Sequence, residues 1–211
     1  MKAQMHIFPV FSEILQRTDR ERFLQQHSKV VWLTGLSGSG KTTIAKHLER
    51  KLFEQGFFAQ ILDGDNIRSG INSNLGFSLE DRRENIRRIA EIAKLYLNSG
   101  VIVLASFISP TAEIRDLARS IIGAEDFIEI FVNTPLQICE QRDTKGLYAK
   151  ARRGLIQDFS GVNSPYEAPA APALEIKTDQ MSIEQAVDCI YTHLEACIKI
   201  ANCEPQNANR E

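Results

Sequence analysis

One short stretch of this chain has the residue types and the spacing that bind phosphate groups. The sequence "GLSGSGKTT" places Gly35, Gly40, Lys41 and Thr42 at the spacing G-x-x-x-x-G-K-[ST] of a P-loop. Glycines let the backbone curl so that several N–H groups point at one phosphate, and a helix that begins near Lys41 adds its positive end. The lysine can reach the β and γ phosphates, and the Thr42 hydroxyl can ligate Mg²⁺. We therefore predict a nucleoside triphosphate site here; a glycine-rich turn without a ligand is the alternative.

A carboxylate follows the next predicted strand, in "LDGDNIRSG". Asp63 is expected at the carboxyl end of that strand, beside the P-loop, where it could hold Mg²⁺ or take a proton from an acceptor hydroxyl. Asp65 is expected to orient neighbouring groups. The alternative is an ordinary Asp-Gly turn.

A cluster of arginines lies in "GFSLEDRRENIRR". Ser78 with Asp81 predicts the start of a helix, and the basic side chains that follow suit an anionic substrate with planar groups. These side chains are Arg82, Arg83, Arg87 and Arg88. A solvated helix whose arginines pair with glutamates is the alternative.

The elements that position these residues can be predicted from apolar patterns. Short apolar runs at residues 29–35, 57–64, 101–108 and 126–133 predict strands, and a weaker run at 173–178 predicts a fifth. Helical patterns alternate with them, and Gly56 and Gly100 follow two of these helices. Strands that alternate with helices of this length predict an α/β fold, a three-layer α/β/α sandwich of the P-loop type with a mainly parallel sheet.

The chain divides into one main domain and two short ends. Residues 29–202 are predicted to form the domain, and residues 143–173, rich in glycine, proline and basic residues, a mobile lid. Residues 1–28 are predicted to be a helical extension that begins with a capping box at residues 18–21. Residues 203–211 are predicted to be a flexible tail.

Composition excludes several classes of protein. The 211 residues carry a formal net charge of −2, which gives no reason to expect nucleic acid or an anionic membrane as a partner. No apolar stretch is long enough to span a bilayer and no secretory signal is recognised, so we expect a cytoplasmic protein. Cys189, His193 and Cys197 fall on one helical face, but half-buried packing is a better interpretation than a metal site.

These features favour a small-molecule kinase among P-loop proteins. The N-K-x-D stretch with which switch GTPases read guanine is missing, and motors are usually larger. A mobile basic segment suits a lid that closes over phosphates and excludes water. Another small P-loop kinase and a nucleotide-binding regulator without turnover remain as alternatives.

Six stretches together resemble the adenylylsulfate kinase (APS kinase) family over about residues 29–200. They are "GLSGSGKTT", "DGDNIR", "GFSLEDRRENIRR", "FISP", "CEQRDTKGLYAKAR" and "FSGVNSPYEAP", in this order. The resemblance implies transfer of the γ-phosphoryl group of ATP, with Mg²⁺, to the 3′-hydroxyl of adenosine 5′-phosphosulfate (APS). It also implies a homodimer and allows a functional link to ATP sulfurylase, which supplies APS. The chain departs from the family pattern at Thr42, Ser160 and Asn163, where Ser, Thr and Asp are usual.

The motifs and the resemblance assign residues to three roles. The predicted ATP-binding residues are Gly35, Leu36, Ser37, Gly38, Ser39, Gly40, Lys41, Thr42, Thr43 and Arg142. The resemblance implies that the substrate contacts Asp65, Asn66, Ile67, Arg68, Phe77, Arg82, Asn85, Ile108, Ser109, Lys145 and Phe159. The predicted catalytic residues are Lys41, Asp63 and Ser109, and the predicted Mg²⁺ ligands are Thr42 and Asp63.

Within this assignment, Phe77 and Phe159 would form the two faces of an adenine clamp, and Arg68 and Arg82 would bind the phosphosulfate. Bacterial members of the family are often given a phosphoserine intermediate, which would be Ser109 here. Direct in-line transfer is the alternative.

Overall fold

The computed structural model describes residues 8–200, and within them five parallel strands form one sheet in the order β2-β3-β1-β4-β5. These strands are β1 (Val30–Thr34), β2 (Ala59–Asp63), β3 (Ile102–Ser106), β4 (Phe127–Asn133) and β5 (Leu174–Lys177). All five predicted strands are confirmed, including the weak fifth. Every residue of β1 and β3 is buried, which explains their continuous apolar sequence.

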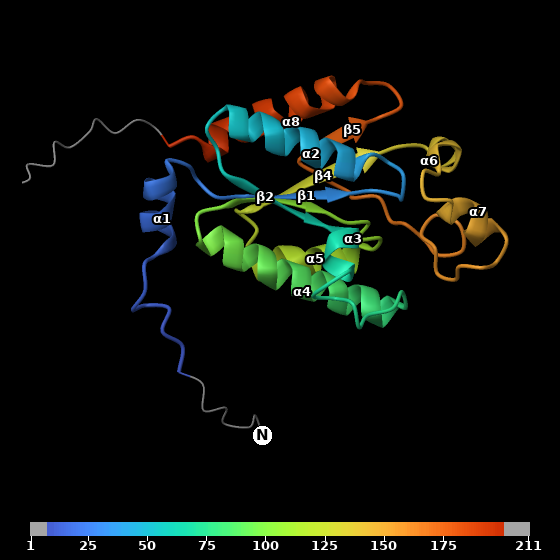
Figure 1. Ribbon diagram of the computed structural model, residues 1–211, viewed down its shortest axis with the longest axis horizontal. Helices are drawn as coiled ribbons and strands as arrows, with labels where there is room; N and C mark the ends of the chain where they lie inside the picture. Colours follow the sequence, from blue (N-terminus) through green and yellow to red (C-terminus); the bar gives the residue numbers. More distant parts are fainter. Residues whose placement is uncertain (1–7, 201–211) are drawn as a thin grey trace, which may run out of the picture.

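Helices cover both faces of the sheet, so the predicted three-layer α/β/α sandwich is confirmed (Figure 1). One face carries α2 (Lys41–Glu54) and α8 (Ile183–Ile198), and the other carries α4 (Leu79–Asn98) and α5 (Ala112–Ile122). Each pair encloses its own apolar core against the sheet. The predicted start of α4 is confirmed, because the Ser78 hydroxyl accepts a hydrogen bond from the Asp81 amide.

Three short helices lie at the carboxyl end of the strands. They are α3 (Gly64–Arg68), α6 (Leu136–Arg142) and α7 (Leu147–Arg152). Helix α7 lies within the predicted lid, where Tyr148, Ala151 and Phe159 form a third small apolar cluster. The parallel arrangement brings the carboxyl ends of all strands to this edge, so the site can be built only here.

Helix α1 (Arg17–Leu24) lies at the opposite, amino end of the strands (Figure 1). The predicted capping box at residues 18–21 is wrong: Gln16 is the N-cap, and the Asp19 carboxylate accepts the Gln16 amide at 3.0 Å. The helix begins two residues earlier than predicted, and Arg17 in its first turn forms hydrogen bonds with Asp126 on the main domain. The described part of the predicted extension is helical only over this single helix.

Glu21 joins α1 to the segment that leads from this helix into β1. Its carboxylate accepts the amide and hydroxyl of Ser28 at 2.8 and 2.6 Å and pairs with Arg17 at 2.8 Å. Burial opposes its ionisation, but the hydrogen bonds from Ser28, Arg17 and His27 outweigh burial and lower the pKa of Glu21 to about 2.

Other predictions concern residues outside the site. The predicted tail at residues 203–211 lies outside the described residues. Cys189 is exposed and Cys197 half-buried on α8, and residues 8–200 contain no group of three or more His, Cys, Asp or Glu that could hold a metal ion. No helix among these residues is long and apolar enough to cross a membrane.

Candidate active site

The loop between β1 and α2 has the backbone conformation of a phosphate-binding loop. Gly38 has a φ of +74° and Gly40 a φ of +103°, values that suit glycine. A Cβ atom at Gly35 would lie 2.4 Å from the carbonyl oxygen of Val132, so the loop can approach β4 only with glycine at this position. Helix α2 begins at Lys41, directly after the loop, and its amino end faces the site.

The ammonium group of Lys41 lies inside this loop. Its Nζ donates hydrogen bonds to the carbonyl oxygens of Gly35 at 2.9 Å and Leu36 at 2.7 Å. Burial lowers the pKa of Lys41 to about 8, although the carboxylate of Asp63 acts in the opposite direction. A buried ammonium whose partners are neutral carbonyls is well placed to exchange them for phosphate oxygens.

Oxygen atoms from three elements meet beside the loop. The Thr42 hydroxyl at the start of α2 donates to Asp63 Oδ2 at 2.8 Å and lies 3.4 Å from Ser106 Oγ. Asp63 and Ser106 end the neighbouring strands β2 and β3 in register. A carboxylate with hydroxyl groups is a donor set that fits Mg²⁺, which binds one or two carboxylates together with phosphate oxygens.

A single large cavity connects the loop with the arginine-bearing helix α4. Its volume is about 1170 Å³, above the range of about 300–1,000 Å³ typical of a pocket for one small ligand. The predicted site residues that line it are Ser37, Gly38, Gly40, Lys41, Thr42, Thr43, Asp63, Asp65, Arg68, Phe77, Arg82, Asn85, Ile108, Ser109, Arg142, Lys145 and Phe159. The cavity therefore has room for two nucleotides.

Five predicted site residues do not line this cavity. Ile67 packs into the core beneath α4, and Asn66 is exposed to solvent on α3. Gly35, Leu36 and Ser39 shape the loop through their backbone and side-chain packing instead. A helix of five residues can turn only part of its surface toward one cavity, which the motif "DGDNIR" alone does not reveal.

Two arginines face the cavity without a carboxylate partner. Among the described residues, Arg68 and Arg82 form hydrogen bonds only with backbone carbonyls, and both lie against the ring of Phe77 at 4.4 and 5.7 Å from its centroid. Burial lowers the pKa of both guanidinium groups, and Arg68 adds to this effect on Arg82. Two desolvated cations beside an aromatic ring form an attractive site for an anion.

The other predicted arginines have partners on the surface of the protein. Arg87 and Arg88 both pair with Glu84, at 2.7 and 2.8 Å, and Arg83 pairs with Glu113 at 3.0 Å. For these three side chains the solvated-helix alternative is therefore the correct one.

The hydroxyl group of Ser109 is directed into the protein. Ser109 is 2 % exposed, and its Oγ accepts the indole N–H of Trp32 at 3.1 Å and donates to Thr34 Oγ1 at 3.0 Å. The residue has a φ of +39°, which is uncommon for serine. Two buried partners therefore hold this oxygen, although the residue lines the cavity.

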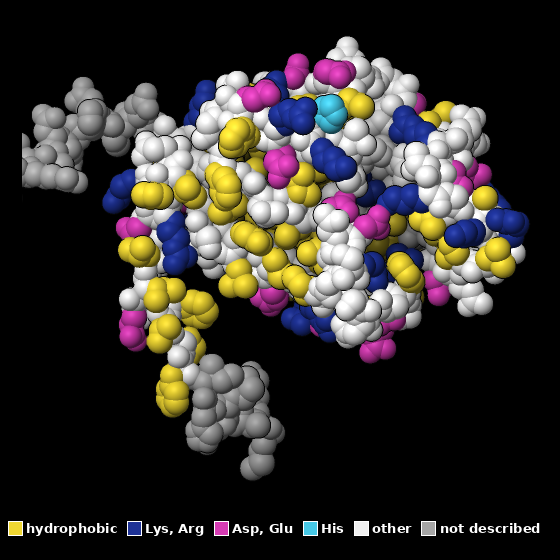
Figure 2. All heavy atoms as spheres, in the orientation of Figure 1, with side chains coloured by type: hydrophobic (Ala, Val, Ile, Leu, Met, Phe, Trp, Pro, Cys, Tyr) yellow, Lys and Arg dark blue, Asp and Glu magenta, His cyan; other side chains and the backbone are white. Residues whose placement is uncertain are grey.

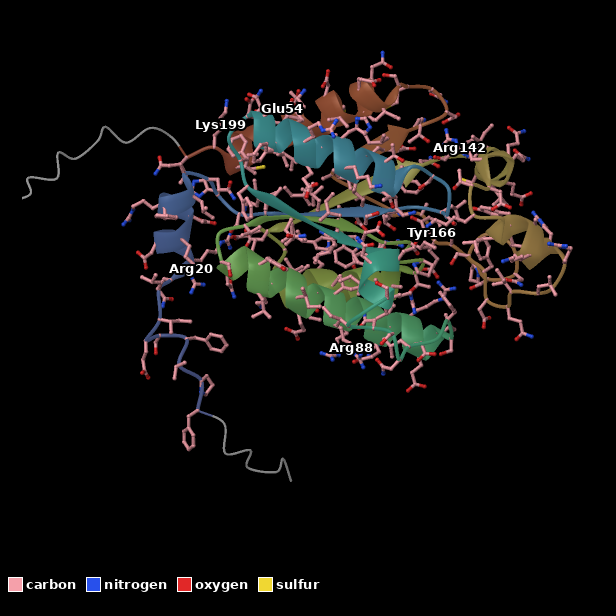
Figure 3. All side chains as sticks on the ribbon, viewed as in Figure 1. Arg20, Glu54, Arg88, Arg142, Tyr166 and Lys199 are labelled. Atoms are coloured by element: carbon pink, nitrogen blue, oxygen red, sulfur yellow. The ribbon has the colours of Figure 1, made fainter. Side chains whose placement is uncertain are left out.

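Basic side chains in and directly before the predicted lid contact both halves of the cavity. Lys145 forms an ion pair with Asp65 on α3, and Arg142 donates to the hydroxyl and carbonyl oxygens of Thr178, each at 2.9 Å. Figure 3 shows Arg142 and Tyr166 near the carboxyl ends of the strands, and Arg20 and Lys199 at the opposite end.

Sequence reasoning missed Thr178, Ser106 and Tyr148. The Thr178 hydroxyl donates to the Ser39 carbonyl at 3.0 Å, and the Tyr148 hydroxyl donates to the Ser37 carbonyl at 2.9 Å, so both support the P-loop. Thr178 directly follows β5 and Ser106 ends β3. The rule that ligands bind at the carboxyl ends of parallel strands could have identified both.

Three features define a P-loop phosphotransferase with an anionic acceptor. They are the parallel sheet, the loop between β1 and α2, and the two neighbouring arginines Arg68 and Arg82. Comparison with known proteins is more specific. Residues 27–177 match the model of the family "Adenylylsulphate kinase". The chain belongs to this family.

Individual relatives agree with this family. The chain is 57% identical over 188 residues to an adenylyl-sulfate kinase of Bacteroides thetaiotaomicron, covering 89% of this chain and 94% of that protein. It is similar to the Mycobacterium tuberculosis APS kinase solved in complex with AMPPNP and APS, with 50% identity, a TM-score of 0.77, and coverage of 80% and 98% of the two chains. A hexameric APS kinase from Thiobacillus denitrificans has 32% identity and a TM-score of 0.61, and the match covers 82% of this chain and 29% of that chain.

Proposed function

We propose that this protein transfers the γ-phosphoryl group of ATP to the ribose 3′-hydroxyl of APS, which gives 3′-phosphoadenosine 5′-phosphosulfate and ADP. The observation that carries the proposal is the cavity, which has a P-loop on one wall and two unpaired arginines beside an aromatic ring on the other. The P-loop would take ATP, and Arg68 and Arg82 would take the phosphosulfate. Phe77 and Phe159, which line the same cavity, would hold the adenine ring of APS.

The chemical step needs charge stabilisation, a metal ion and a proton acceptor. The Lys41 ammonium would leave its carbonyl partners for the β and γ phosphates, where negative charge develops during transfer. Thr42 and Asp63 would hold Mg²⁺, which neutralises charge on the phosphate oxygens when bound. Asp63 would also take the proton of the 3′-hydroxyl as the new P–O bond forms and the bond to ADP breaks.

Direct transfer between the two nucleotides is the mechanism that the position of Ser109 supports. Its hydroxyl is bonded to Trp32 and Thr34, so attack on ATP would require the serine to leave both partners. A phosphoserine intermediate would be detected by trapping wild-type enzyme with labelled ATP in the absence of APS. We expect no label on the protein.

A coupled assay with ATP and APS tests the proposed reaction. The control acceptor is AMP, which keeps the adenosine and the 3′-hydroxyl but lacks the sulfate. Phosphorylation of APS alone supports the proposal, and equal rates with AMP would indicate a general nucleotide kinase instead. Binding of both nucleotides without turnover would indicate a regulator.

We also propose that residues 143–173 act as a lid. This segment contributes Lys145, Leu155 and Phe159 to the cavity, and basic side chains close together repel each other unless phosphates neutralise them. Limited proteolysis should cut the segment in the free protein, and ADP with APS should slow this cleavage. Equal rates of cleavage with and without ligands would contradict a lid.

A homodimer is part of the proposal. Strand β2 is an edge of the sheet, and exposed apolar side chains flank it, namely Phe53 (74% exposed), Phe58 (52%) and Leu95 (63%). Figure 2 shows apolar side chains gathered on this face between α2 and α4. Light scattering after size exclusion tests the dimer.

We also propose a location in the cytoplasm and a functional link to ATP sulfurylase, as the source of APS.

A further inference from the structure

We propose that Arg115 is a positioning residue for the acceptor nucleotide, because its buried guanidinium holds the turn Ile108–Ser109–Pro110 that lines the acceptor half of the cavity. This inference rests on the proposed function, from which the identity of the acceptor, APS, is taken. Arg115 contributes nothing to the lining of the cavity itself, so it would act only through the turn.

The guanidinium of Arg115 joins three elements inside the protein. Arg115 belongs to α5, is 3% exposed, and donates from Nη1 to the carbonyl oxygen of Ser109 at 2.9 Å. Its Nε lies 3.0 Å from Oε1 of Glu129, a residue of β4 that is 6% exposed. Arg115 and Glu129 thus form a buried ion pair, and the hydrogen bond of Arg115 goes to the carbonyl of Ser109.

The turn requires such support because its backbone is strained. Ser109 has a φ of +39°, and a residue that is not glycine keeps this conformation only where its surroundings enforce it. Trp32 and Thr34 hold the serine hydroxyl, and Thr34 Oγ1 also donates to the carbonyl of Ile108 at 2.7 Å. Arg115 donates to the carbonyl of Ser109.

Loss of Arg115 should affect the two substrates differently. Without it the buried carbonyl of Ser109 would lose its charged donor, which favours a rearrangement of the turn. Ile108, Ser109 and Pro110 line the cavity on the side of the proposed acceptor. The P-loop and Lys41 make no hydrogen bond with Arg115, so binding of ATP should change little.

The first experiment measures KM for each substrate in Arg115→Lys and in the charge-balanced double variant Arg115→Met with Glu129→Gln. We expect KM for APS to rise about tenfold, the effect of one lost hydrogen bond to a charged group, and KM for ATP to stay within about twofold. Arg119→Met is the matched control, since Arg119 pairs with the same Glu129 at 3.0 Å, but its side chain is 37% exposed and its hydrogen bond goes to Glu129 and not to the turn. An equal change in both KM values, or the same effect in the control, would overturn the proposal.

The second experiment uses fluorescence and needs no turnover. Trp32 is the only tryptophan of the chain, is fully buried between Phe107 and Phe127, and donates its indole N–H to Ser109. Its emission therefore reports the state of the turn. We expect the emission of Arg115→Lys to differ from that of the wild type, and unchanged emission would overturn the proposal. If wild-type protein fails to phosphorylate APS, the proposed function fails, but this comparison still tests the support of the turn.

Discussion

The buried ammonium group of Lys41 makes the strength of ATP binding dependent on pH. Burial lowers the pKa of Lys41 to about 8 in the free protein. A bound triphosphate favours the charged ammonium, so the pKa of this group in the complex must be higher. Affinity is therefore greatest below pH 8 and falls as the pH rises through 8, because binding must then be accompanied by uptake of a proton.

The size of this effect follows from the free-state pKa. With a pKa of about 8, the charged fraction of Lys41 falls from about nine-tenths at pH 7 to about one-tenth at pH 9. If the pKa in the complex exceeds about 10, affinity falls about tenfold over this interval, which equals about 1.4 kcal/mol.

Isothermal titration with AMPPNP and Mg²⁺ at pH 7, 8 and 9 measures both the affinity and the proton uptake, when each titration is repeated in buffers of different ionisation enthalpy. We expect uptake of about half a proton at pH 8. Lys41→Arg is the control, since a guanidinium stays charged over the whole range and should abolish the slope. A wild-type affinity independent of pH, or the same slope in the variant, would refute the role given to this ammonium.

Three further substitutions have expected outcomes. Asp63→Asn should lower kcat about 10²- to 10⁴-fold while the affinity for ATP changes less, because its carboxylate acts mainly during transfer; an unchanged kcat at saturating substrates would remove it from the mechanism. Arg68→Ala should lower kcat/KM for APS about 10- to 100-fold and leave KM for ATP nearly unchanged, which initial rates with each substrate will decide. Glu21→Gln should make the free energy of unfolding depend less on pH in the acid range. The wild-type carboxylate stabilises the fold above its unfolded pKa of 4.5, and this contribution is lost as the pH falls toward about 2. Denaturant unfolding at pH 7 and pH 3 checks this. If the free energy of unfolding falls equally from pH 7 to pH 3 in the wild type and the variant, the role of Glu21 is contradicted.

Local patterns in the sequence were sufficient for the elements of the sheet and for the phosphate-binding loop. The loop is a local structure, in which Gly35, Gly40 and Lys41 act on their immediate neighbours, so a spacing rule describes it. Strands β1 and β3 are buried on both faces, and their continuous apolar runs therefore identify them.

The tertiary structure decided which polar residues face the cavity and which only support it. Arg82 and Arg83 are adjacent in the sequence, yet one faces the cavity and the other pairs with Glu113 on the surface, because successive residues of a helix point in directions about 100° apart. No sequence pattern could place Arg115 against the carbonyl of Ser109, since that contact depends on how α5 packs on the sheet. The sequence by itself determined that phosphate is bound and where the strands run, because these depend on neighbours along the chain. The acceptor half depends on side chains that meet only when helices from distant segments cover the sheet, and so it was decided by packing.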